Sequence, residues 1–226
     1  DMGDNAMDPR KNHEDLYFYF VPSKTKLHSH YKYLPKFIDT DNLYPEKCTD
    51  GKLTVYVDHF KYQNEKERND SINAINKIFF AIKNSKIPLR VFYHTSNGIE
   101  IDRLTPEITK NKSQIAKFLP FDQIAKYYRK TDIFFPTHRE TQGMVAQEIA
   151  ACGGLTILQS WMYPKSTLGQ FAHIIYNQND KIDFGSIRQS LKQISPNQIR
   201  EHTLKSCSFD NFKDKLYKEI IKLLKT

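Results

Sequence analysis

The sequence predicts an α/β fold, a Rossmann-like and mostly parallel sheet with helices on both faces. Short runs rich in β-branched and aromatic residues alternate with amphipathic segments from residue 52 to the C-terminus. Strands that alternate with helices at this spacing form right-handed βαβ units, and their parallel sheet is covered on both sides. Because ligands of such sheets bind outside the carboxyl ends of the strands, we expect functional residues in the loops that follow strands.

The composition fits a globular chain. Its 226 residues are enough for one large domain, or for one domain and a fragment of another. Hydrophobic residues make up 39% and charged residues 27%, and no apolar run approaches the ~18 residues that span a bilayer. The first residues, DMGDNAMDPRKNHED, are polar, unlike a secretory signal. We therefore expect a cytoplasmic location, with peripheral association at the membrane surface as an alternative.

Cysteines and net charge narrow the classes of partner. Cys48, Cys152 and Cys207 lie far apart without a CxxC pair, which argues against a disulfide framework and a zinc site. A net charge of +8 favours an anionic partner, such as a nucleotide, a nucleic acid or a lipid headgroup, but it also fits a solvated lysine-rich surface. Because no nucleic-acid recognition motif is present, we expect no nucleic-acid partner.

The N-terminal part of the chain has an irregular pattern. A polar segment of about fifteen residues is expected to be disordered. DLYFYFV (residues 15–21) predicts a short aromatic strand, and residues 27–51 are expected to be mainly irregular, with an extended piece near residues 33–38. Proline and turn residues make residues 27–51 a candidate linker.

Strands are predicted regularly after this linker. KLTVYVDH begins the series with β-branched residues and a tyrosine, and DIFFPTH is its fourth member. The predicted strands are residues 52–59, 88–94, 115–121, 132–138, 155–159 and 173–176.

Helices are predicted between these strands. Asp70 and Asp122 are candidate N-caps, because an aspartate oxygen can accept hydrogen bonds from the first backbone amides of a helix. Two or three further helices close the chain, the last with a stripe of apolar residues on one face. The earlier predicted helices are residues 70–86, a polar segment near 105–115, residues 122–131, and a helix that begins at Gly143.

The segment THRETQGMVAQEIAACGG (residues 137–154) carries the candidate site. Gly143 opens its helix, so the amides of Gly143, Met144 and Val145 lack intrahelical acceptors and can bind a phosphate. Glu148 lies roughly 7.5 Å further along the axis, about the separation of a ribose from the distal phosphate of a nucleoside diphosphate. Glu140 precedes the phosphate position and would face the group attached beyond it. In the simpler interpretation, Glu148 is a surface carboxylate and Glu140 only complements the helix dipole.

This segment resembles the donor-binding signature of retaining GT-B glycosyltransferases, P-S-x-x-E-x-F-G-hydrophobic-x-x-x-E-A-x-A-C-G between two strands. Three other stretches are similar to family segments in the same order: LPKFIDTDNLYP, AKFLPFDQIAKYYRKTDIFF and SFDNFKDKLYKEI. The residues in register with the signature are Pro136, Thr137, Glu140, Gly143, Glu148, Ala151, Cys152 and Gly153.

The resemblance implies a role for each part of the segment. Glu140 would contact the transferred sugar as the catalytic residue, Glu148 would bind the ribose, and the helix amides with Thr141 and Gln142 would hold the diphosphate. The amides would stabilise the leaving diphosphate electrostatically, as a metal does in other transferases. The resemblance implies a metal-independent, cofactor-free mechanism, and the one DxD triplet of the sequence, residues 39–41, lies outside the signature segment. The implied reaction is hexosyl transfer, with retention, from a nucleotide-sugar to a glycan or lipid-linked acceptor.

The resemblance also implies a domain division. Residues 1–45 would be an N-terminal extension, a remnant of the acceptor-side domain and a linker, and residues 46–226 the Rossmann-like nucleotide-sugar-binding domain, the C-terminal half of a GT-B fold. The chain would be a fragment, a domain of a longer protein, or one partner of a split enzyme. Alone it would bind a donor without efficient turnover, and a separate N-terminal domain or partner chain would complete it.

Two stretches depart from the family pattern. After the first strand of this domain, His59 replaces the expected arginine, and Lys61 is the nearest lysine. After the fifth strand, the expected Gly-Gly-x-x-E loop is replaced by QSWMYPKSTLGQ. Its Trp161, Met162 and Tyr163 are either core or domain-interface residues or a sugar platform, and Lys165 could supply the missing cation. His138 and Arg139 could face the donor or the solvent.

These departures leave a rival interpretation. The chain could be a non-catalytic nucleotide-sugar-binding or scaffolding domain with degenerate catalytic loops. A nucleic-acid-binding module, prompted by the basic charge, would instead predict steeply salt-dependent binding of RNA or DNA. The residues select neither the nucleotide nor the sugar, and the expected role is in polysaccharide, glycolipid or glycoprotein assembly.

Overall fold

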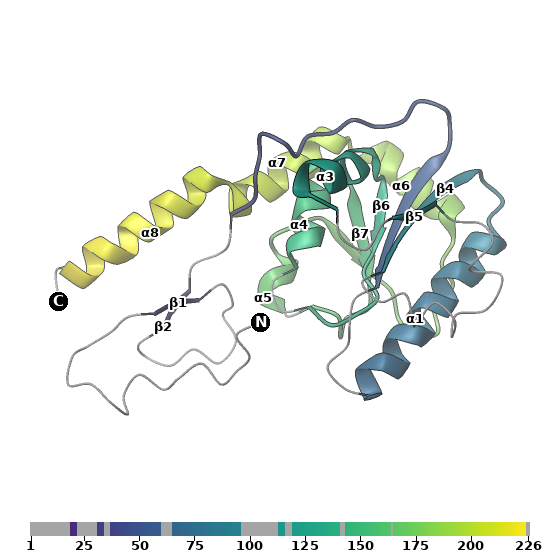
Figure 1. Cartoon of the computed structure of the whole chain (residues 1–226), viewed down its shortest axis with the longest axis horizontal. Helices are drawn as coiled ribbons and strands as arrows, with labels where there is room; N and C mark the ends of the chain where they lie inside the picture. The colour runs from purple at the N-terminus through teal and green to yellow at the C-terminus, as the bar shows by residue number, and fades with distance from the viewer. Residues whose placement is uncertain are drawn as a thin grey trace.

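The computed structural model contains a six-stranded parallel sheet in the order β5-β4-β3-β6-β7-β8 (Figure 1). It describes residues 19–21, 31–33, 37–59, 65–95, 113–115, 119–140, 143–163 and 165–224. The strands are β3 (Leu53–His59), β4 (Leu89–Thr95), β5 (Ser113–Ile115), β6 (Ile133–Phe135), β7 (Leu155–Leu158) and β8 (His173–Ile175). A separate parallel pair joins β1 (Tyr19–Val21) to β2 (Tyr31–Tyr33). The predicted Rossmann-like fold is confirmed.

The strand order reverses beside β3. Val55 of β3 is paired with Val91 of β4 on one side and with Ile133 of β6 on the other. The chain moves outward from β3 through β4 to β5, and then returns to β6 and moves outward in the other direction. Crevices form at such a switch point because the connections leave the two adjacent strand ends toward opposite faces.

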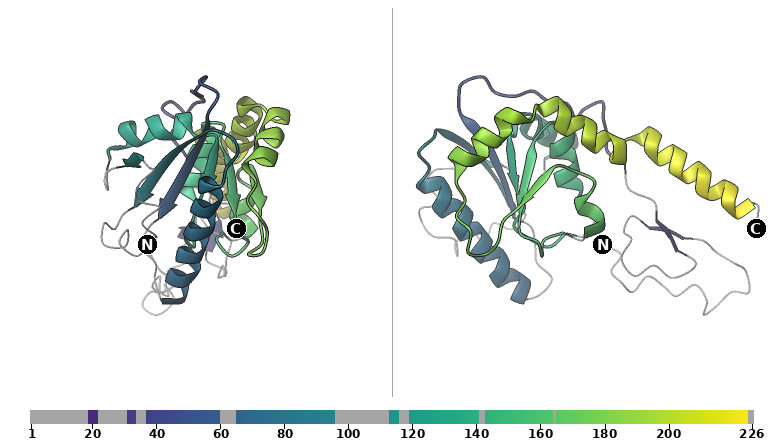
Figure 2. Two further views of the ribbon diagram at one scale, coloured as in Figure 1. Left: turned by 90° about the vertical axis from the view of Figure 1, so that its right-hand side faces the viewer. Right: turned by 180° about the vertical axis from the view of Figure 1, so that it is seen from behind.

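Helices cover both faces of the sheet (Figure 2). Val55 and Val57 of β3 pack on one face with α1, and Tyr56 packs on the other face with α3 and α4, as the two-residue period of a strand requires. The helices are α1 (Glu65–Lys83), α3 (Phe121–Lys130), α4 (Met144–Ala151), α5 (Lys165–Leu168), α6 (Phe184–Gln193), α7 (Pro196–Cys207) and α8 (Phe209–Leu224).

The predicted element boundaries fail in three places. Helix α1 starts at Glu65, so Asp70 lies inside it and is not its N-cap. Helix α3 starts behind Pro120, whose side chain makes no capping bond, and Asp122 lies in its first turn. Strand β5 lies at residues 113–115, whereas the sequence predicted a strand at 115–121 and a polar helix near 105–115. The prediction failed because a three-residue edge strand leaves little hydrophobic pattern.

An extended segment, residues 37–52, crosses the helices on one face and is fixed by α7. The Arg200 guanidinium donates to the carbonyl oxygens of Leu43, Thr40 and Ala151, the last at 2.6 Å.

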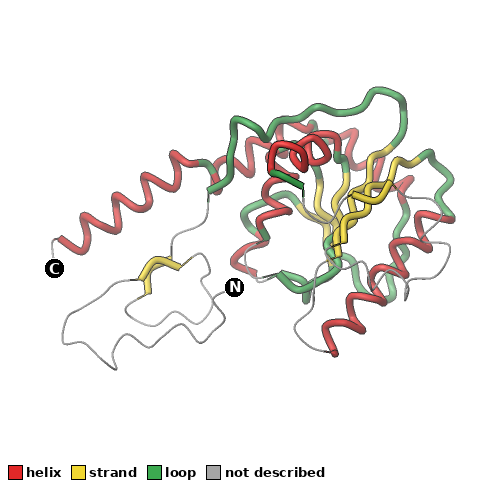
Figure 3. The backbone as a smooth tube through the Cα atoms, viewed as in Figure 1, coloured by secondary structure: helices red, strands yellow, loops and turns green. Residues whose placement is uncertain are grey.

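Helix α8 extends away from the sheet (Figure 3) and exposes Phe209 and Tyr217. Within the described residues, no helix has the length and apolar character needed to cross a bilayer.

Candidate functional site at the carboxyl edge of the sheet

The start of α4 is shaped by Gly143. This residue has φ of +65°, and a Cβ atom built on it would lie 2.4 Å from Cε1 of Tyr163, so only glycine fits. The first intrahelical bond runs from the Gln147 amide to the Gly143 carbonyl at 3.1 Å. The amides at Met144 and Val145 therefore belong to the first turn, where the helix dipole favours an anion. The prediction that Gly143 begins this helix is confirmed.

Glu140 is held by its own backbone in front of this helix. Its amide donates to the Met162 carbonyl at 2.7 Å, which joins the loop after β6 to the loop after β7. Its side chain is 28% exposed, so the carboxylate is accessible while its main chain is fixed. Oε1 of Glu140 lies 2.7 Å from Nε2 of His138.

His138 lies between two carboxylates. Its Nδ1 is 3.8 Å from Oδ1 of Asp58, at the carboxyl end of β3, and its Nε2 contacts Glu140. Thr137 adds a second link, because its hydroxyl donates to the Asp58 carbonyl at 2.6 Å. Both the His138 and the Asp58 side chains are buried, whereas Arg139 is exposed. The structure therefore separates the two residues that the sequence could not rank.

The electrostatics of this cluster follow from its burial. Burial and the charge of Glu140 raise the pKa of Asp58 to about 7, although the charge of His138 lowers it. For His138, burial lowers the pKa, but the hydrogen bond to Glu140 and the charges of Asp58 and Glu140 outweigh burial, so the pKa is raised. The pKa of Asp58 therefore lies near neutral pH, and the pKa of His138 lies above its ordinary value.

Glu148 is a second carboxylate with a changed pKa. It lies on α4 one turn beyond Met144 and is partly buried. Burial, with a smaller contribution from the charge of Asp39, raises its pKa to about 7. Its charge also helps to raise the pKa values of Tyr56 and Tyr128, which lie on the same face of the sheet as α4.

The structure describes only some of the remaining predicted site residues. His59 is the last residue of β3, but its side chain is outside what the structure describes. Lys165 is exposed at the start of the short α5, and it forms no ion pair within the described ranges. Thr141, Gln142 and Lys61 lie outside the described residues. Asp58 was missed by sequence reasoning because an aspartate at the end of a strand gives no local signal.

The loop after β7 divides into core and surface. Met162 and Tyr163 are buried in the core that α4 covers, so they are not a sugar platform. Trp161 is only partly buried, and its Nε1 donates to Oε1 of Gln159 at 2.5 Å. It lines a cavity of about 500 Å³ together with Gln159, Tyr176 and residues of α1.

No metal-binding cluster of three or more histidine, cysteine or acidic side chains occurs in the described part of the chain. This finding concerns only the described residues, and a metal-free mechanism stays a prediction.

Comparisons with solved structures agree with the fold. The chain is similar to sucrose-phosphate synthase from Thermosynechococcus elongatus, with a TM-score of 0.59, 14% identity, and coverage of 87% of this chain and 54% of that one. It is also similar to Anabaena HepE in complex with UDP and glucose, with a TM-score of 0.61, 9% identity, and coverage of 90% and 62%.

A third similar structure is AviGT4, a glycosyltransferase involved in avilamycin A biosynthesis, with a TM-score of 0.58, 9% identity, and coverage of 87% and 59%. At these identities the likeness shows the fold, and the chain spans little more than half the length of these structures. No protein-family model and no curated protein matches the sequence.

Proposed function

We propose that the chain is the donor-binding part of a retaining, metal-independent GT-B glycosyltransferase of the hexosyl-transferring type. The observation that carries this proposal is the convergence of three features at one strand switch point. These are the glycine-started α4, the partly exposed Glu140 in front of it, and the partly buried Glu148 one turn into it. The donor is a nucleotide-sugar, and the acceptor is a glycan or a lipid-linked glycan.

Each feature corresponds to one part of the donor. The first-turn amides of α4 bind the diphosphate and stabilise the charge that it gains as a leaving group. Glu148 accepts hydrogen bonds from the two ribose hydroxyls, and its partial burial makes this contact stronger than a surface contact. Glu140 contacts the sugar and stabilises the positive charge that develops at the anomeric carbon. Thr141 and Gln142 complete the phosphate loop.

The cation that balances the diphosphate comes from His59, Lys61 or Lys165 in this proposal. Lys165 is exposed and has no competing ion pair within the described residues, so it is available to a ligand. The acceptor-side domain is supplied by another part of the protein or by a partner chain, because the similar structures are much longer than this chain. The enzyme acts in the cytoplasm or at the membrane surface.

A titration with nucleoside diphosphates and their sugars tests the proposal. One member of a UDP, GDP and ADP panel should stabilise the chain by about 2.7 kcal/mol at a hundredfold excess over its dissociation constant. Glu148→Ala should weaken this binding, measured by calorimetry. Glu201→Ala, which removes an exposed glutamate on α7, is the matched control and should leave binding unchanged.

The panel also separates the rival. A scaffolding domain with degenerate loops would bind none of these nucleotides, and a donor domain whose site lies elsewhere would bind one of them equally well after Glu148→Ala. Either result would contradict the proposed function.

A further inference from the structure

A cavity of about 500 Å³ lies beside α1 at the carboxyl edge of the sheet, and none of the donor-binding residues proposed above lines it. Its walls come from α1 and from the loops that follow β7 and β8. Its size is within the range of ~300 to 1,000 Å³ that is typical of small-molecule sites. The side chains that matter here are Asp70, Asn73 and Lys77 of α1, Gln159 and Trp161 after β7, and Tyr176 after β8.

Trp161 provides a fixed apolar surface in this cavity. Its Nε1 donates to Oε1 of Gln159 at 2.5 Å, and the indole is partly buried against the core that α4 covers. The ring therefore has a defined orientation before any ligand binds. An aromatic ring held in this way packs well against the C–H face of a sugar ring, because both surfaces are apolar and rigid.

Polar groups with unused hydrogen-bonding capacity accompany the indole. The Asp70 carboxylate forms no hydrogen bond or ion pair within the described part of the chain. Because Oε1 of Gln159 is occupied by Trp161, the amide nitrogen of Gln159 is the end that can donate to a ligand. Burial raises the pKa of the Tyr176 hydroxyl to about 12 and a contact with Gln159 opposes the rise, but the hydroxyl makes no hydrogen bond of normal geometry with a described residue. Such a mixture of donors and acceptors suits ligand hydroxyl groups, which both donate and accept.

The charges of the cavity favour an uncharged ligand. Nζ of Lys77 donates to the backbone carbonyls of Asn177 at 3.1 Å and Gln178 at 2.6 Å, and it lies 5.2 Å from the centre of the Tyr176 ring. These contacts occupy the ammonium and fix the loop after β8. A phosphate would meet the Asp70 carboxylate, and a cationic ligand would meet Lys77, so a ligand of either charge is repelled by one wall.

We propose that this cavity binds an uncharged sugar residue of a glycan. The indole of Trp161 contacts the C–H face of the sugar, and Asp70 and Gln159 bind its hydroxyl groups. The loop after β7 also joins the cavity to the candidate site, since the Met162 carbonyl accepts from the Glu140 amide at 2.7 Å. The cavity thus holds the acceptor glycan beside Glu140, and this consequence alone rests on the proposed function.

The fluorescence of Trp161 tests binding directly, because it is the only tryptophan of the chain. Glucose, galactose, mannose, N-acetylglucosamine and maltose are the probes, each titrated into the millimolar range. At least one of them should shift or quench the emission in a saturable way. Asp70→Ala should raise the dissociation constant of that sugar by about tenfold, since a charged acceptor is lost. Asp214→Ala, at an exposed position of α8, is the matched control and should leave the constant unchanged.

Three results would overturn the site. The first is the absence of a saturable response to every sugar, and the second is equal binding by the wild type and by Asp70→Ala. The third is a loss of sugar binding in Glu148→Ala without a loss in Asp70→Ala, which would place the sugar in the donor site. Trp161→Phe is a second variant, followed by calorimetry, and it should bind the sugar several-fold more weakly because phenylalanine lacks the Nε1 donor that orients the ring.

The sugar titration and the nucleotide panel fail independently. Sugar binding with no response to any nucleotide would contradict the proposed function and leave this site standing. Nucleotide binding that Glu148→Ala weakens, with no response to any sugar, would support the proposed function and overturn this site.

Discussion

Two aspartates at opposite ends of the central strands, Asp132 and Asp58, differ in the hydrogen bonds and charges around their carboxylates. Asp132, at the amino end of β6, accepts from the Thr54 amide at 2.8 Å and lies near Lys47, whose ammonium donates to the Thr131 carbonyl. Asp58, at the carboxyl end of β3, accepts no hydrogen bond from a described residue. Burial raises the pKa of both carboxyls. At Asp132 the Thr54 amide and the charges of Lys47, Arg90 and Arg188 oppose the rise, whereas at Asp58 the charge of His138 is the main opposing effect.

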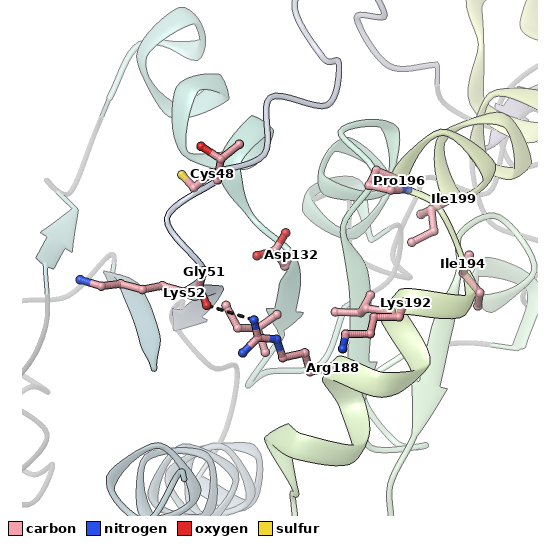
Figure 4. A pocket seen from close by; sticks show the side chains of 13 residues that line it. Cys48, Gly51, Lys52, Asp132, Arg188, Lys192, Ile194, Pro196 and Ile199 are labelled. Atoms are coloured by element: carbon pink, nitrogen blue, oxygen red, sulfur yellow. Dashed lines mark hydrogen bonds between the residues drawn. The ribbon is translucent and has the colours of Figure 1, made fainter. Parts of the chain in front are cut away.

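At the amino ends of the strands, called the amino edge here, charged side chains form ion pairs and hydrogen bonds between different elements. It contains a cavity of about 340 Å³ lined by Asp132, Arg188 and Lys192, among others (Figure 4). Arg188 donates to the Gly51 carbonyl at 3.2 Å across this cavity, and Arg90 forms a 2.5 Å ion pair with Asp50 nearby. The contrast teaches that burial of a carboxylate has opposite meanings at the two edges: satisfied charges fix the fold, and unsatisfied ones at the carboxyl edge remain open to a proton or a ligand.

The largest expected effect on stability comes from Gly143→Ala, which disturbs the start of α4 at the carboxyl edge of the sheet. A Cβ atom at positive φ costs about 1 to 2 kcal/mol, and the clash with Tyr163 adds more, so the free energy of unfolding should fall by about 2 to 4 kcal/mol. Denaturant unfolding measures this change. Gly169→Ala is the matched control, because a Cβ there meets no atom within 4 Å. Equal stability of both variants would contradict the strained start of α4.

Arg200→Gln tests the amino edge, since Arg200 donates to carbonyls of the extended segment and to the last residue of α4. Three acceptors lose a charged donor, and the free energy of unfolding should fall by about 2 to 3 kcal/mol. The loss should be the same at pH 5 and pH 8, because neither arginine nor the carbonyls titrate there. Lys205→Gln, exposed on the same helix, should change stability little. A loss confined to one pH would contradict this assignment.

Sequence reasoning reached the carboxyl edge only in part. Glu140, Gly143 and Glu148 share one continuous stretch, so their spacing is visible in the sequence, and the structure places them at one edge. Asp58 reaches this edge only because β3 lies beside β6, a long-range pairing that no local pattern encodes. The sheet was predictable because its central strands are apolar on both faces, whereas β5, a three-residue edge strand, was misplaced.

Asp58→Asn should increase the free energy of unfolding at high pH, whereas Gly143→Ala and Arg200→Gln should decrease it. Folding raises the pKa of Asp58 from 3.8 to about 7, so the stability present below about pH 4 is lost as the pH rises through about 7. The neutral amide avoids this loss, and the variant should be more stable than the wild type by about 1 to 3 kcal/mol at pH 8. At pH 4 the gain should disappear. A variant that is less stable at pH 8 would mean that Asp58 is satisfied as a carboxylate.

The smallest expected effect is at Glu148. It tests whether a second carboxylate at the carboxyl edge, besides Asp58, lowers the stability of the fold when it is ionised. Folding raises its pKa from 4.5 to about 7, so its stability contribution is also lost as the pH rises through that range. Because the side chain is partly exposed, Glu148→Gln should stabilise the chain by only about 1 kcal/mol at pH 8, and not at pH 4. Thermal unfolding at the two pH values measures this, with Glu201→Gln as the exposed control. If Glu148→Gln destabilised the chain instead, the carboxylate would be a structural partner like Asp132, and its assignment to the ribose would lose its physical basis.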